Sequence, residues 1–133
     1  MANTLTQDDE TATRDLLMGR RIVAAEMGDF PTEGYNKATG RLTLDDGTQV
    51  LIAPNDGGCS CGGGDYDLDK LTTVDNVITD VRLACEEEPG HYGQSYRVYV
   101  VADNVEINVL SVKGDDGSGY YGTGYELFVV PAV

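Results

Sequence analysis

The stretch that decides the fold is GRLTLDDGTQVLI, residues 40–52, in which two β-rich runs flank Asp45-Asp46-Gly47. An Asp-Gly pair supplies the positive φ that a tight β-hairpin needs, and the flanking residues favour strands. Because successive side chains of a strand point to opposite faces, four apolar side chains share one face of this hairpin: Leu42, Leu44, Val50 and Ile52. The stretch therefore predicts an antiparallel hairpin with one buried face.

Further strands are predicted on both sides of this hairpin. They are rich in β-branched and aromatic residues and cover residues 21–27, 77–85, 95–102, 105–112 and 120–130. The short link Asp103-Asn104 predicts a second hairpin between the third and fourth of them. In the second, strict alternation predicts one apolar face: Val77, Thr79, Val81, Leu83 and Cys85.

Residues 1–19 predict an acidic N-terminal segment with a short helix. Thr6 can cap this helix, and Gly19 can end it after Leu16-Leu17-Met18. We therefore expect this segment and one β-rich domain over residues 20–133. The fold class is mainly β, bordering on α+β: a single curled antiparallel sheet, or a small barrel or sandwich, of six to seven strands with one short N-terminal helix.

The charge of the chain limits the classes of molecule that it can bind. The 133 residues contain 23 Asp and Glu against 9 Lys and Arg, a formal net charge of −14. Nucleic-acid phosphates and anionic membranes are bound mainly by Lys and Arg, so we expect neither as a direct partner. No apolar run approaches the roughly 20 residues that cross a bilayer, and residues 1–10 show no signal-peptide pattern. We expect a cytoplasmic protein.

The negative charge is concentrated in one part of the chain. Residues 56–90 hold nine acidic residues against two basic ones, which is half of the net charge. A strongly acidic surface attracts cations or basic proteins. We predict that an interaction surface includes six of these residues: Asp65, Asp67, Asp69, Glu86, Glu87 and Glu88.

The cysteines and the histidine of the chain form a candidate metal site. Three cysteines and one histidine match the ligands of a tetrahedral zinc site, and they are Cys59, Cys61, Cys85 and His91. Two observations favour thiols that bind no metal. The spacing Cys59-x-Cys61 is tighter than usual, and Cys85 falls on the predicted apolar face of its strand.

The acidic residues 65–69 begin like a calcium-binding loop, because Asp65-x-Asp67-x-Asp69 has the required rhythm. The pattern then fails. An EF-hand needs glycine at the sixth position and glutamate at the twelfth, where this chain has Lys70 and Asn76. We therefore interpret these residues as a solvated acidic loop, with a weaker, irregular calcium site as the alternative.

Catalysis is the minority hypothesis. His91 could serve as a base for Ser95 or Cys85, but a third group and an oxyanion site cannot be located from the sequence. The glycine-rich runs 57–64 and 117–124 lack the spacing and the lysine of a phosphate-binding loop. We expect a protein that is not an enzyme and needs no cofactor, with zinc as the alternative.

Several short motifs resemble an uncharacterised family of small proteins that tailed bacteriophages encode. In chain order they are LxGRRI at 17–22, LxLDDGT at 42–48, the cysteines after the second hairpin strand, VIxDV at 77–81 and GYYG at 119–122. The resemblance covers about residues 16–130. It implies a phage gene product in the host bacterial cytoplasm or in the virion, and it implies no activity, because the family has none established.

The leading functional hypothesis is a binding module that acts on a host or phage macromolecule, with a basic protein surface as partner. The alternative is a structural or assembly accessory protein of the virion. A further alternative is a sponge for a small signalling nucleotide, which would require several of the scattered bases to gather around one pocket. The sequence leaves the oligomeric state open.

Overall fold

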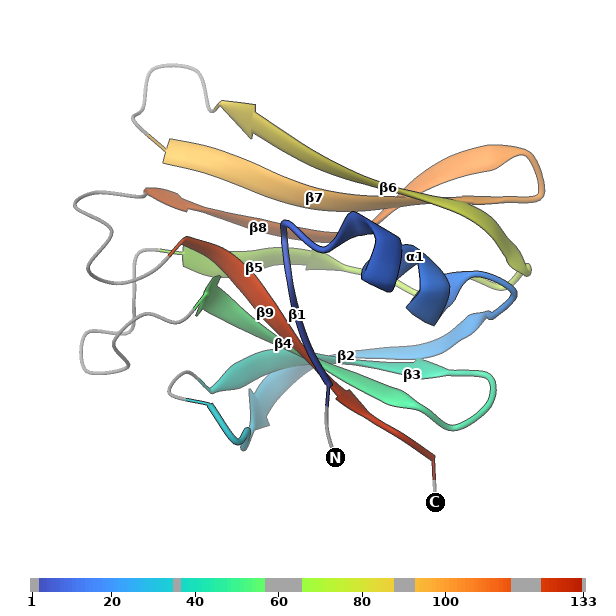
Figure 1. Ribbon diagram of the computed structural model, residues 1–133, viewed down its shortest axis with the longest axis horizontal. Helices are drawn as coiled ribbons and strands as arrows, with labels where there is room; N and C mark the ends of the chain where they lie inside the picture. Colours follow the sequence, from blue (N-terminus) through green and yellow to red (C-terminus); the bar gives the residue numbers. More distant parts are fainter. Residues whose placement is uncertain (1–2, 35–36, 57–65, 88–92, 116–122, 133) are drawn as a thin grey trace.

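Two antiparallel β-sheets and one short helix make up the residues that the computed structural model describes, 3–34, 37–56, 66–87, 93–115 and 123–132 (Figure 1). The elements are β1 (Asn3–Thr6), α1 (Glu10–Leu17), β2 (Ile22–Phe30), β3 (Ala38–Leu44), β4 (Gln49–Asp56), β5 (Tyr66–Leu71), β6 (Ile78–Glu87), β7 (Gly93–Ala102), β8 (Val105–Asp115) and β9 (Thr123–Val130). The five-stranded sheet has the order β1-β9-β4-β3-β2, and the four-stranded sheet has the order β5-β8-β7-β6.

This arrangement confirms the mainly β, antiparallel fold with one short N-terminal helix. The described residues form two sheets rather than one curled sheet or a closed barrel, and they contain nine strands rather than six to seven. In this part of the chain α1 is the single helix, and it is neither long nor apolar enough to cross a membrane.

Both predicted hairpins are confirmed. In β3–β4, Leu42 lies opposite Val50 and Gly40 lies opposite Ile52, while Gly47 takes a φ of +91° in the turn. The four apolar side chains of the predicted face are all buried. In β7–β8, the turn residues Asp103 and Asn104 have φ values of +52° and +62°. Left-handed conformations at both central residues are those of a type I′ turn, which matches the twist of the strands.

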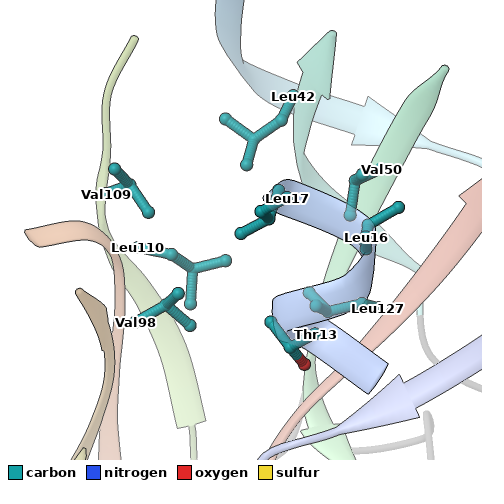
Figure 2. A pocket seen from close by; sticks show the side chains of 9 residues that line it. All are labelled: Thr13, Leu16, Leu17, Leu42, Val50, Val98, Val109, Leu110 and Leu127. Carbon is teal, nitrogen blue, oxygen red and sulfur yellow. The ribbon is translucent and has the colours of Figure 1, made fainter. Parts of the chain in front are cut away.

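The core lies between the two sheets, and α1 closes it from one side (Figure 2). Leu17 and Thr13 of the helix are buried, and Leu16 packs against the core. They line a cavity with residues of both sheets: Leu42, Val50 and Leu127 from one, Val98, Val109 and Leu110 from the other. The cavity has about 10 Å³ of internal space, which is about one water molecule. This cavity therefore has no room for a ligand larger than about one water molecule.

Two of the strands were not predicted. Residues 3–6, expected within the helical segment 1–19, form β1, which pairs with β9 through Thr4 and Phe128. Of residues 65–69, expected as a solvated acidic loop, those from Tyr66 on belong to β5 (Tyr66–Leu71), which pairs with β8. Tyr66 is buried and Leu68 is half-buried, whereas Asp67 is exposed. This alternation is a strand signal that the acidic residues obscured.

The predicted face of the strand over 77–85 is partly wrong. A bulge between Ile78 and Asp80 shifts the phase of β6, because a bulge places an extra residue opposite its partner strand. As a result Ile78 and Val81 are both buried, while Val77 is exposed. Cys85, which strict alternation places on the apolar face, is also exposed.

The start of α1 differs from the prediction, whereas its end agrees. Thr6 does not cap the helix. Its backbone N–H instead donates to the Asp9 carboxylate at 2.8 Å, which fixes the turn between β1 and α1. Gly19 follows the helix with a φ of +78° and donates its N–H to the Ile78 carbonyl oxygen. Glycine adopts this conformation without steric cost, so the helix ends there.

The side chain of Asn55 links the two sheets. Its amide nitrogen donates to the Tyr66 carbonyl oxygen at 3.1 Å, and its Oδ1 accepts from the Tyr66 N–H at 2.8 Å. Asn55 is 3% exposed and Tyr66 is 1% exposed. Asn55 also has a φ of +75°, a conformation that asparagine adopts more readily than most residues. This contact, the Asn55 clamp, joins β4 to β5 in the other sheet.

We expect the variant Asn55→Ala to lose about 3–5 kcal/mol of unfolding free energy, because two buried backbone groups lose their partners and alanine is strained at positive φ. Asn104→Ala is the matched control, since Asn104 has a similar φ but is exposed in a turn. Urea denaturation measures both. Equal losses in the two variants would show that the clamp contributes nothing beyond backbone strain.

A second buried polar group lies in β9. The Tyr125 side chain is 1% exposed, and its hydroxyl has no hydrogen-bond partner among the described residues. Burial raises the pKa of this hydroxyl well above its usual value, and the nearby carboxylates of Asp8 and Asp9 raise it further. The hydroxyl is therefore neutral in the folded protein and ionises more readily in the unfolded chain.

We expect Tyr125→Phe to keep or raise the unfolding free energy at pH 7, by up to about 1 kcal/mol, because it removes an unpaired buried hydroxyl. Above pH ~10 the unfolded chain loses this proton first, so the folded wild type is progressively destabilised as pH rises. The variant lacks this contribution. Urea denaturation at pH 7 and pH 10.5 compares the two proteins, and an equal alkaline loss in both would rule out Tyr125 as its source.

Candidate functional site

The predicted acidic surface is in part assembled on the outer face of the four-stranded sheet. Asp67 of β5 lies opposite Lys113 of β8, which lies opposite Ser95 of β7, and Ser95 lies opposite Glu86 of β6. Asp67, Asp69 and Glu86 are exposed. Asp65 and Glu88 lie outside the described residues, and of Glu87 only the backbone, paired with Gln94, is described.

Basic side chains are interleaved with these carboxylates. Arg97 forms an ion pair with Glu86 at 2.9 Å, and it also donates to the Ser95 hydroxyl at 3.0 Å. The Lys113 ammonium lies 3.6 Å from a carboxylate oxygen of Asp69. This face is therefore a network of opposite charges. It does not present Asp69 and Glu86 as unpaired carboxylates.

A third ion pair lies on the same outer face, between Arg82 and Glu106. Arg82 of β6 donates to both carboxylate oxygens of Glu106, at 3.3 and 3.0 Å, and its guanidinium lies 4.4 Å from the ring centre of Tyr99. This hydrogen bonding lowers the pKa of Glu106 below its usual value. The Tyr99 hydroxyl accepts a hydrogen bond from Arg97 at 3.3 Å. Three bases thus gather on one face, but each already has a carboxylate partner.

Ion pairing is general for the basic residues. Of the nine bases of the chain, six take part in ion pairs of the described residues: Arg14 with Asp80, Arg20 with Asp46, Arg41 with Glu26, Arg82 with Glu106, Arg97 with Glu86, and Lys113 with Asp69. Each pair is locally neutral, so the net charge of −14 comes from the other 17 carboxylates and the other three bases. The surface field is therefore negative and little interrupted by unpaired bases.

A second acidic surface, which the sequence analysis missed, surrounds the start of α1. The N-terminal acidic patch consists of Asp8, Asp9, Glu10 and Asp15, which line a shallow surface depression with Thr11 and Ala12. Asp8, Glu10 and Asp15 are exposed. In the sequence, the run Asp8-Asp9-Glu10 is simply part of the acidic N-terminal segment. The closeness of Asp15, one and a half turns along α1, was the signal that could have shown a patch.

Two members of this patch have structural roles. Asp9 accepts from Thr6, as described above, and Glu10 accepts from the Leu83 N–H of β6 at 3.0 Å. Nearby, Arg14 of α1 donates to the Val81 carbonyl oxygen at 3.1 Å. Glu10 and Arg14 thus satisfy backbone groups at the edge of the four-stranded sheet. Asp8 and Asp15 remain available on the exposed side of the patch.

The structure describes one of the four predicted zinc ligands. Cys59, Cys61 and His91 lie outside the described residues. Cys85 is exposed on β6, and its thiol donates to the Gln94 side-chain oxygen at 2.8 Å. Among the described residues, no group of three His, Cys, Asp or Glu side chains is arranged to hold a metal ion. The zinc site therefore stays a prediction.

A chain of neutral side chains runs from Gln94 into the core. The Tyr96 hydroxyl donates to the Gln94 side-chain oxygen at 3.0 Å and lies 3.3 Å from the Thr123 hydroxyl. Thr123 in turn donates to the Tyr66 hydroxyl at 3.4 Å, and the rings of Tyr66 and Tyr96 are 5.8 Å apart. The chain joins both sheets at one end of the molecule. Its groups are uncharged at neutral pH, so it serves packing and positioning.

The hypothesis of a catalytic serine loses support. Ser95 has no exposed surface, and its hydroxyl accepts a hydrogen bond from Arg97 and lies 3.5 Å from the Ser111 hydroxyl. A nucleophile must reach a substrate. Ser95 therefore functions as a buried partner of Arg97 in the charged face.

Metal analysis of the purified protein tests the zinc site. We expect a metal-free chain whose urea midpoint is unchanged by a chelator, because the exposed Cys85 thiol already has a protein partner. Elemental analysis gives the zinc content of the wild type and of Cys85→Ser. One zinc per chain in the wild type, lost in Cys85→Ser, would contradict this expectation and establish the site.

Comparison with known proteins gives one match. No curated protein and no solved structure matches the chain. A family model described as a domain of unknown function, DUF7448, matches residues 15–127, which is most of the chain and nearly the stretch covered by the motif resemblance. The match includes every strand from β2 to β8 and most of β9, so it covers both sheets. The chain belongs to the DUF7448 family.

Proposed function

We propose that the protein is a non-enzymatic binding module that docks on a basic surface of a protein partner. The observation that carries this proposal is the pairing of the bases. Six of the nine are held against carboxylates, and the excess negative charge is left at the surface. Such a field accelerates encounter with a positively charged partner and repels polyanions.

The N-terminal acidic patch supports this proposal. Asp8 and Asp15 are exposed beside a shallow depression. The structural carboxylates Asp9 and Glu10 hold the patch in place, because they are hydrogen-bonded to backbone N–H groups of β1 and β6. A rigid patch loses less conformational entropy on binding than a flexible one. The patch is therefore a suitable docking point for lysine or arginine side chains.

The charged outer face argues against a sponge for a signalling nucleotide. Arg82, Arg97 and Lys113 gather there, as that hypothesis requires, but each is paired with a carboxylate. A phosphate would have to displace these carboxylates and approach a strongly negative protein. The arrangement favours a protein partner over a nucleotide.

We infer further that the protein is encoded by a tailed bacteriophage and acts on a host or phage macromolecule in the bacterial cytoplasm. This inference is based on the short motifs that resemble such phage proteins, LxGRRI at 17–22 and LxLDDGT at 42–48 among them. Of these motifs, the second forms the β3–β4 turn and the first joins α1 to β2. Both motifs shape the fold, on which the geometry of any binding surface depends.

Pull-down from a bacterial lysate at increasing salt tests the proposed function. We expect a protein partner that is retained at about 0.15 M salt and lost near 1 M, where the Debye length falls to about 3 Å. The double variant Asp8→Asn, Asp15→Asn should retain several-fold less partner, since it removes two exposed charges of the patch.

The matched control is the double variant Asp45→Asn, Asp103→Asn, which removes the same charge from two exposed hairpin turns. We expect it to retain nearly as much partner as the wild type. The absence of any enriched protein at every salt concentration would contradict the binding proposal. If both double variants retained equally less partner, binding would depend on the net charge and not on the N-terminal acidic patch.

A further inference from the structure

The edges of the two sheets are protected unequally. An edge strand exposes unpaired backbone groups that can bind another strand, so proteins usually cover or shorten such edges. At the edge of the four-stranded sheet, Glu10 and Arg14 of α1 bind the backbone of Leu83 and Val81 in β6. At its other edge, the Asn55 clamp binds both backbone groups of Tyr66 in β5. Both edges of this sheet are therefore covered in part.

The five-stranded sheet has a short edge and a long one. Its β1 edge has four residues, whereas β2 has nine. Ile22 at the start of β2 is hydrogen-bonded to Val74 in both directions. From Val23 to Phe30, β2 pairs with β3 on one side and with no strand of the described residues on the other. This segment, Val23–Phe30, is the free β2 edge.

The free β2 edge has the character of a binding surface. Val23 and Met27 are each 57% exposed, so two large apolar side chains lie open to a partner along this edge. Bulges occur between Ile22 and Ala24 and between Met27 and Phe30, but the residues between them pair regularly with β3. The strand contains no lysine or proline, the residues that most often prevent pairing at an edge.

Charge selects the partner of this edge. A second copy of the chain would bring another net charge of −14 to the interface and would be repelled. Two carboxylates also lie on β2 itself, Glu26 and Asp29, and both are exposed. Arg41 binds Glu26 at 2.8 Å, whereas no described base is paired with Asp29. The negative charge at this edge therefore attracts a basic strand and repels a second copy of the chain.

We propose that the free β2 edge accepts an extended segment of a protein partner, rich in lysine or arginine alternating with apolar residues, as an additional antiparallel or parallel strand. Backbone hydrogen bonds provide the affinity in this mode of recognition, and alternate side chains provide specificity. Val23 and Met27 contact the apolar side chains, and the negative field attracts the basic ones. This inference rests on the proposed function, of which it names the docking strand and the form of the partner.

A synthetic nine-residue peptide of alternating lysine and valine, with blocked ends, is the probe. We expect it to bind the full chain at physiological ionic strength and to slow amide hydrogen exchange in residues 23–30. Met27→Lys should weaken binding about tenfold, because it removes an apolar contact and adds a like charge at the edge. Fluorescence anisotropy of the labelled peptide gives the dissociation constants.

The matched control is Val105→Lys. Val105 is also 57% exposed, and it begins β8 in the other sheet. Its replacement by lysine changes the net charge by the same amount as Met27→Lys. We expect it to bind the peptide within about twofold of the wild type, as one distant surface charge implies at this ionic strength. Circular dichroism and urea midpoints confirm that both variants are folded.

The outcomes separate the two proposals. If the wild type binds neither this peptide nor a lysine homopolymer, the proposed preference for basic partners is overturned along with the docking site. The peptide could instead bind the wild type while both variants weaken its binding equally, or the slowed amides could lie outside residues 23–30. Either result would keep the preference for basic partners and contradict the free β2 edge as the docking site. Sedimentation that shows a dimer, lost in Met27→Lys, would assign the edge to a second copy and overturn the basic segment.

Discussion

The association of the two sheets depends on the Asn55 clamp. Apolar contacts between sheets are non-directional, so they bring the sheets together without fixing how one lies on the other. Asn55 supplies the direction, since its amide binds both the N–H and the C=O of Tyr66. The Tyr66 ring lies beside Tyr96 of its own sheet, and the Tyr66 hydroxyl accepts from Thr123 of the other sheet. One side chain at a left-handed position therefore fixes where β4 meets β5, and Thr123 joins β9 to Tyr66 and Tyr96 beside it.

The parts of the fold that are visible in the sequence are those made by neighbours in the chain. The β3–β4 and β7–β8 hairpins follow from their turn residues, because Gly47, Asp103 and Asn104 provide positive φ where the strands reverse. The missed strands, β1 and β5, pair with β9 and β8, which are distant in the sequence. The bulge in β6 is equally hidden, because it leaves no local pattern; beside it, Ile78 is hydrogen-bonded to Gly19 and Arg20, which are distant in the sequence.

The candidate site shows a similar division. The sequence correctly indicates how many carboxylates lie between residues 56 and 90, but their partners come from elsewhere in the chain. Glu86 meets Arg97 through the β6–β7 ladder, and Asp69 meets Lys113 through the β5–β8 ladder. Strand register decides which charges are neutralised, so a count of acids cannot locate an unpaired surface. The N-terminal acidic patch was missed for the converse reason, because it depends on the way α1 is held against β6.

Carboxylates in this protein serve both structure and surface charge, and position separates the two roles. Glu10 and Asp9 each accept a backbone N–H, so their charge fixes α1 between β1 and the edge of β6. Asp8, just before α1, and Asp15, in its last turn, are exposed and contribute chiefly to the field. The covered edge of β6 and the free edge of β2 follow from this arrangement, since the helix can lie along only one of them. A strand added to β2 would extend the five-stranded sheet on the side away from β3, and it would leave the clamp, the helix and the core in place.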